Sequence, residues 1–118
     1  VSDNKDMKRP EETLQRAAVT YLRLLENQGK LLFYHPPNGG RRSKSEGARF
    51  KAAGVKPGVS DLAFVLPGGQ AAFIELKAPT GRTTTAQKDF LDRVEGFGAL
   101  TAVCNTFDQV VEAVDSWL

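Results

Sequence analysis

The sequence is poor in the side chains that form disulfides and bind zinc. Among its 118 residues there is one cysteine, Cys104, and one histidine, His35. A single cysteine excludes an internal disulfide and a cysteine-rich zinc site, and a single histidine disfavours every mechanism that needs a histidine pair. No stretch reaches the roughly 18–20 apolar residues of a membrane-spanning helix. We therefore expect one cytoplasmic domain, 1–118, with a modest core and no secretory leader.

Positive charge is concentrated in one stretch of the chain. The net charge is only +2, yet residues 41–56 carry +5 and the remainder carries −3. This basic segment contains one acid, Glu46, against Arg41, Arg42, Lys44, Arg49, Lys51 and Lys56. Such a segment is typical of proteins that bind the phosphate backbone of nucleic acid, and a solvated loop is the alternative. Because it is also rich in glycine and serine, we expect 39–56 to be mobile, as are the polar residues 1–9.

Hydrophobic periodicity and turn residues predict the order α-β-β-β-α-β-α. We expect a first helix from Pro10 to Gly29, and a capping box at Thr84 and Gln87 that opens the second. The other expected elements are strands over 31–34, 61–66, 70–77 and 100–104, a last helix from residue 106, and one helical turn within 46–53. The predicted fold is an α/β layer sandwich around a mixed sheet.

Three charged residues interrupt two otherwise apolar strands: Asp61, Glu75 and Lys77. If residues 67–69 form the hairpin loop, Leu66 pairs with Gln70 and Asp61 lies opposite Glu75. Directly opposed side chains have Cβ atoms about 4.5–5.5 Å apart. Glu75 and Lys77 also share one face of their strand, because side chains alternate between faces. The simplest register therefore brings two carboxylates and an ammonium group together.

Two like charges placed opposite each other destabilise a sheet, and a bound divalent cation reverses that effect. Mg²⁺ prefers oxygen ligands, uses one or two protein carboxylates and keeps several waters. It can polarise a phosphoryl oxygen and activate a bound water. Lys77 could then position the water or stabilise the phosphate. The alternative is an ordinary cross-strand ion pair on a solvated face.

Three further polar residues have two interpretations each. Glu11 ends the core-facing stripe of the first helix, so it could reach a metal or simply favour the helix dipole. Gln87 fits the capping box and also the stripe that faces the sheet. His35 could contact DNA or a metal, or could be structural.

Taken together, the chain resembles the VRR-Nuc family of the PD-(D/E)XK, restriction-endonuclease-like superfamily. The stretches that carry the likeness are EETLQ at 11–15, HPPN at 35–38, GVKPGVSDLAFVLPGGQAAFIELK at 54–77 and GRTTTAQK at 81–88. The superfamily pattern has a proline before the aspartate, whereas Val59 and Ser60 precede Asp61 here, as the family tolerates.

The resemblance implies a role for each matched residue. Asp61, Glu75, the Leu76 carbonyl and Glu11 would bind Mg²⁺ or Mn²⁺, while Lys77 and Gln87 would assist hydrolysis. Gln15, His35 and Asn38 would support the site. Arg82 and Lys88 would join the basic segment in holding the DNA backbone.

Stand-alone members of the family, from phages and bacteria, imply a homodimer that cuts branched DNA during recombination and repair. The predicted function is therefore a Holliday junction resolvase. Twofold symmetry of a dimer would match that of a four-way junction. A less selective nuclease on flaps, nicks or duplex, and a catalytically silent DNA-binding module, are the alternatives.

Overall fold

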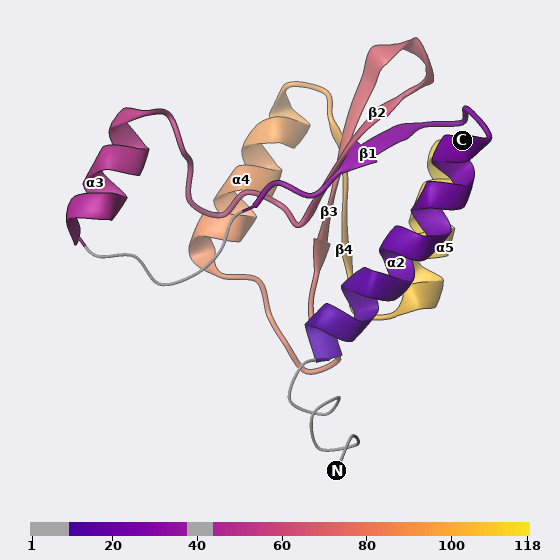
Figure 1. Ribbon diagram of the computed structural model, residues 1–118, viewed down its shortest axis with the longest axis horizontal. Coiled ribbons are helices and arrows are strands. Elements are labelled where there is room, and N and C mark those ends of the chain that lie inside the picture. Colours follow the sequence, from indigo (N-terminus) through magenta and orange to yellow (C-terminus); the bar gives the residue numbers. More distant parts are fainter. Residues whose placement is uncertain (1–9, 38–43) are drawn as a thin grey trace.

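The computed structural model describes residues 10–37 and 44–118, and it confirms the predicted order of elements (Figure 1). The elements are α2 (Pro10–Asn27), β1 (Leu32–Tyr34), α3 (Lys44–Ala52), β2 (Leu62–Leu66), a 3-10 turn (Pro67–Gly69), β3 (Gln70–Leu76), α4 (Thr85–Gly96), β4 (Leu100–Cys104) and α5 (Phe107–Trp117). α3 is a nine-residue helix where a single turn was expected. Within the described ranges, no helix combines the length and the apolar character needed to cross a membrane.

The four strands form one mixed sheet in the order β1-β2-β3-β4. β2 is antiparallel to both β1 and β3, and β4 is parallel to β3. Leu66 pairs with Gln70 and Leu62 pairs with Ile74, so the predicted hairpin register is confirmed. Gly68 and Gly69 make this short connection possible, since both adopt a positive φ, near 79° and 77°, which glycine tolerates without strain.

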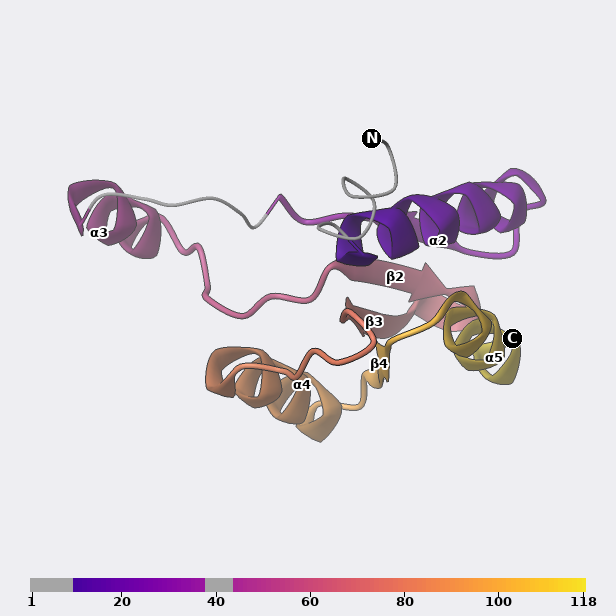
Figure 2. The same cartoon turned by 90° about the horizontal axis from the view of Figure 1, so that it is seen from below.

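Helices cover the two faces of the sheet unequally. α2 and α5 pack on one face, where Leu22 and Val114 belong to the same buried cluster as Leu62 and Ile74. α4 lies on the opposite side from α2 (Figure 2). There Phe90 meets Phe73 of β3 in an edge-to-face contact with ring centroids 5.3 Å apart. The face that α4 covers is therefore the face of Phe73 and, two residues further along β3, of Glu75.

α4 does not cover the β1–β2 half of the sheet face on which it packs. The pairing of Leu32 with Val65 places both side chains, with Tyr34, on this face. They are 53%, 48% and 55% exposed. α3 stands apart from the sheet and its covering helices (Figures 1 and 2). The molecule thus combines a packed three-layer body with one projecting helix and one uncovered apolar surface.

Candidate active site

The two predicted carboxylates meet where β2 begins and β3 ends. Asp61 immediately precedes β2, and the pairing of Leu62 with Ile74 places it next to Glu75. One Asp61 carboxylate oxygen, Oδ2, accepts a hydrogen bond from the backbone N–H of Leu76, 2.8 Å away. The sheet therefore fixes the orientation of Asp61 as well as its position.

Glu75 is almost completely buried, at 2% exposure. Its Oε1 lies 3.9 Å from Lys77 Nζ and accepts a hydrogen bond from Gln87 Nε2 at 3.3 Å. Its other oxygen, Oε2, has no hydrogen-bond partner in the described part of the chain. The same is true of the buried hydroxyl of Ser60, the neighbour of Asp61. A buried polar atom without a partner is costly, so it indicates a place for a further group.

Burial raises the pKa of Glu75 to about 9. The adjacent carboxyl group of Asp61 contributes to this raised pKa, Lys77 opposes it, and Glu11 adds a smaller increase. Without a cation, the Glu75 carboxyl is consequently protonated at neutral pH. A cation bound between the two carboxylates would take the place of that proton.

Gln87 has both of the roles that its sequence context suggested. Its side chain accepts from the backbone N–H of Thr84, and the Thr84 hydroxyl accepts from the backbone N–H of Gln87. This is the predicted capping box of α4. The same side chain donates to Glu75 from its amide nitrogen. The cap thus holds the glutamine in the orientation that the site requires.

Gly58 allows the segment before Asp61 to pack closely against the start of α4. It has φ of +77°, and a Cβ there would lie 2.3 Å from the backbone oxygen of Ala86. That separation is well below the van der Waals contact distance, and the backbone of Ala86 cannot easily move away. Only glycine fits both the dihedral and the gap, which keeps the Asp61 and Gln87 segments together.

His35 contacts the backbone of Asp61. Its Nδ1 donates to the backbone carbonyl of Asp61 at 2.6 Å. This bond joins the residue after β1 to the residue before β2, which agrees with the structural interpretation. A contact of His35 with DNA or a metal stays a prediction. Asn38, its predicted companion, lies outside the described residues.

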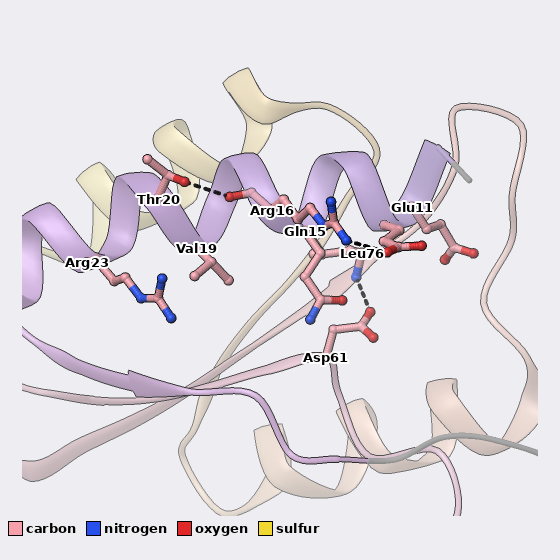
Figure 3. A pocket seen from close by; sticks show the side chains of 9 residues that line it. Glu11, Gln15, Arg16, Val19, Thr20, Arg23, Asp61 and Leu76 are labelled. Carbon is pink, nitrogen blue, oxygen red and sulfur yellow. Dashed lines mark hydrogen bonds and ion pairs between the residues drawn. The ribbon is translucent and has the colours of Figure 1, made fainter. Parts of the chain in front are cut away.

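A cleft of about 690 Å³ opens beside Asp61 (Figure 3). Asp61 and Leu76 form one side, and α2 forms the other with Glu11, Glu12, Gln15, Arg16, Val19, Thr20 and Arg23. The Gln15 side chain points toward Asp61 (Figure 3). Both predicted α2 residues, Glu11 and Gln15, therefore share a cleft with Asp61.

Sequence reasoning missed the remainder of this wall. Gln15, Val19 and Arg23 follow Glu11 at intervals of four residues, which places them on one stripe of α2. That spacing was the available signal. It does not by itself predict a cleft beyond Gln15, because the apolar positions of α2 that follow indicate the core.

Two carboxylates, and not three, converge here. Within residues 10–37 and 44–118, no group of three or more histidine, cysteine, aspartate or glutamate side chains is close enough to hold a metal. Glu11 is exposed on the cleft wall, and its coordination of a metal stays a prediction. Asp61 and Glu75 alone match the one or two carboxylates that Mg²⁺ uses.

The predicted DNA-binding residues whose side chains the structure describes are all exposed. Arg49 and Lys51 are exposed on α3, and Lys56 is exposed in the segment that follows it. Arg82 is exposed before α4, and Lys88 is exposed in the first turn of that helix. The remaining three, Arg41, Arg42 and Lys44, either lie outside the described residues or have side chains that are not described.

Comparison with known proteins agrees with the geometry. The family model for the VRR-NUC domain matches residues 7–108. Two similar solved structures are a "VRR_NUC domain" (22% identity, TM-score 0.64, 92% of this chain and 97% of that one) and a "VRR_NUC domain protein" (21% identity, TM-score 0.71, 92% and 87%). None of the curated proteins matches significantly. With its sheet, helices and paired carboxylates in place, the chain belongs to the VRR-NUC family and carries a DNA nuclease domain.

Proposed function

We propose that the protein is a metal-dependent, structure-selective DNA endonuclease that acts as a homodimeric Holliday junction resolvase. The observation that carries the catalytic part is Glu75, a buried carboxyl with one unpartnered oxygen beside Asp61 and Lys77. A protein that only binds DNA gains nothing from burying acids next to phosphate, because they repel it.

The donor set fits Mg²⁺ or Mn²⁺. Asp61 and Glu75 would hold the ion, together with the Leu76 carbonyl and, from α2, Glu11. When bound, such an ion polarises a phosphoryl oxygen and lowers the pKa of a bound water. The unpartnered Glu75 Oε2 and the raised pKa of Glu75 both support this assignment, since a divalent cation satisfies the oxygen and displaces the proton.

Lys77 and Gln87 complete the reaction centre. Lys77 is 8% exposed and is held on the Glu75 side of β3. From there its ammonium group can hold the attacking water or donate to the non-bridging oxygens as negative charge grows on the phosphate. Gln87 keeps Glu75 in place through its amide. Hydrolysis proceeds by direct attack of water, with no covalent enzyme intermediate.

A second copy of the chain would cover the uncovered half of the sheet. The exposed side chains there, Leu32, Tyr34 and Val65, carry no formal charge, whereas a DNA-binding surface needs cations. An isologous pairing through this face would give two catalytic sites related by twofold symmetry, as a four-way junction requires.

The test compares a synthetic four-way junction with a duplex of the same sequence, in Mg²⁺, Mn²⁺ or EDTA. Wild type should make paired, metal-dependent nicks in the junction and leave the duplex intact. Lys77→Ala should bind the junction without cutting it, and Lys30→Ala, an exposed lysine outside the cleft, should behave as wild type.

Other outcomes separate the alternatives. Equal cutting of both substrates would establish a less selective nuclease and reject the resolvase. Binding without cutting in either metal would indicate a silent DNA-binding module. Sedimentation of wild type and Val65→Asp tests the dimer: the variant should be monomeric, and an unchanged dimer would place the interface elsewhere.

A further inference from the structure

The α2 wall of the cleft carries a cation that neither the metal site nor the basic segment accounts for. Arg23 lines the cleft together with Asp61, Gln15 and Val19. Its guanidinium group extends from the far end of α2 toward the cleft (Figure 3). In the part of the chain that the structure describes, no carboxylate forms an ion pair with it.

The other arginine of this wall differs in a decisive way. Arg16 NH2 lies 3.0 Å from Glu12 Oε1, one turn earlier on α2, so a carboxylate already accompanies its charge. Thr20 is similarly occupied, because its hydroxyl donates to the backbone carbonyl of Arg16 at 3.0 Å. Arg23 is thus the cleft-lining arginine, among the described residues, that forms no ion pair with a carboxylate.

Charge is distributed along the cleft as a nuclease substrate would require. Asp61 and Glu11 lie toward one end of the α2 wall, and Arg23 lies at the other (Figure 3). Acids belong where a metal bridges protein and phosphate, and cations belong where the backbone leaves the reaction centre. A single DNA strand running along α2 would pass first the acidic end of the cleft and then Arg23.

The spacing sets the register of that contact. Gln15, which points toward Asp61, and Arg23 are eight residues apart on α2. At a rise of 1.5 Å per residue this is about 12 Å along the helix. The rise of about 3.4 Å per nucleotide in B-form DNA is measured along the duplex axis, and neighbouring phosphates of one strand lie further apart than that. The interval therefore corresponds to only a few nucleotides.

We propose that Arg23 binds a backbone phosphate a few nucleotides from the scissile one, so that α2 forms one wall of the path of the cut strand. This inference rests on the proposed nuclease function. Guanidinium groups suit it because their planar set of N–H donors contacts phosphate oxygens in pairs. It adds to the basic segment a contact that is fixed on the same helix as Gln15.

The first experiment measures binding of Arg23→Gln to the four-way junction in Ca²⁺ over a range of salt concentrations. Removing one phosphate contact should lower the slope of log K against log salt by about 0.7–0.9 in magnitude. Arg23→Lys should retain most of the slope, because it keeps the charge. Lys30→Gln, another exposed cation outside the cleft, should leave the slope unchanged.

A second experiment locates the contact with junctions that carry one uncharged methylphosphonate at successive positions. Wild type should lose affinity at one position a few nucleotides from the cut, and Arg23→Gln should be insensitive at that position alone. If Arg23→Gln keeps the wild-type slope and the wild-type methylphosphonate pattern, the proposed contact does not exist.

The two proposals fail in different ways. Normal metal-dependent cleavage by wild type, together with an unchanged slope in Arg23→Gln, would reject the Arg23 contact and keep the nuclease. A reduced slope in Arg23→Gln with no cleavage by wild type in any metal would keep the DNA path along α2 and reject the nuclease. Thermal unfolding of each variant serves as the folding control.

Discussion

The proposed reaction centre and the basic segment differ in how their charged side chains are held. Asp61, Glu75 and Lys77 are fixed on neighbouring strands, with Glu75 and Lys77 nearly inaccessible to water. Arg49 and Lys51 are exposed on α3, which stands apart from the sheet (Figure 1). Catalysis needs groups held to within a fraction of an ångström, whereas binding a backbone needs mainly cations in the right region. Damage to the first should therefore abolish turnover, and damage to the second should weaken binding gradually.

The largest effect should follow removal of Lys77. Lys77→Ala deletes an ammonium group held beside the reacting phosphate, so the single-turnover cleavage rate should fall by at least about 100-fold. Junction affinity should change little, because a buried lysine contributes little to the counterion term. Cleavage by Lys77→Ala within about threefold of wild type would exclude Lys77 from the reaction centre.

Gly58→Ala should be the most destabilising change outside the buried core. The new methyl group would collide with the backbone of Ala86 and would sit at φ of +77°. We expect a loss of about 2–4 kcal/mol in the free energy of unfolding, measured by urea denaturation. Cleavage should fall with it, because Asp61 and Gln87 lose their common anchor.

Gly54→Ala is the matched control for Gly58→Ala. Gly54 also has a positive φ, +96°, but nothing lies within 4 Å of a Cβ added there. The loss in the free energy of unfolding should come only from the strain of an alanine in the left-handed conformation, about 1–2 kcal/mol. Equal losses in the two variants would show that the contact with Ala86 contributes nothing.

Glu75 should make the metal-free protein less stable as pH rises. Its pKa is about 9 in the folded protein against an ordinary value of 4.5. The unfolded chain therefore releases this proton first, and the stability that Glu75 contributes is complete below pH 4.5 and is lost progressively up to pH 9. Glu75→Gln should remove this dependence, and at pH 8 in EDTA it should be more stable than wild type by about 1–3 kcal/mol.

Thermal unfolding at pH 5 and pH 8 measures that difference. Asp89→Asn is a suitable control, because Asp89 is an exposed carboxylate on α4. A parallel pH response in wild type and Glu75→Gln would mean that Glu75 is already ionised in the metal-free protein.

The smallest effect should come from single cations of α3. Lys51→Gln should reduce the salt slope of junction binding by about one phosphate contact and leave the maximal cleavage rate unchanged. Cleavage measured at saturating enzyme, alongside the binding titration, separates the two quantities. A reduced maximal rate in Lys51→Gln would show that α3 takes part in catalysis and does more than bind DNA.

The sequence predicts the proximity of Asp61 and Glu75 well because local rules determine it. The loop over 67–69 sets the hairpin register, and the register then brings Asp61 to Glu75 with no long-range information. The capping box at Thr84 is equally local, and it orients Gln87. Strand alternation alone places Lys77 with Glu75.

Long-range packing explains what the sequence did not show. The contact between Gly58 and Ala86 joins segments that no periodicity relates. The cleft role of Arg23 depends on how α2 crosses the sheet above Asp61. The predicted third carboxylate ligand, Glu11, depends on the same crossing, and the described carboxylates do not form a group of three.

Binding of Mn²⁺, measured by titration calorimetry in buffers of different ionisation enthalpy, tests the central claim most directly. Wild type should bind the ion near pH 7 and release about one proton, because the cation replaces the proton of Glu75. Glu75→Gln should lose most of the affinity and all of the proton release, while Lys77→Ala should keep both. Equal Mn²⁺ binding by wild type and Glu75→Gln would contradict the assignment of this buried carboxylate as the metal ligand of the nuclease.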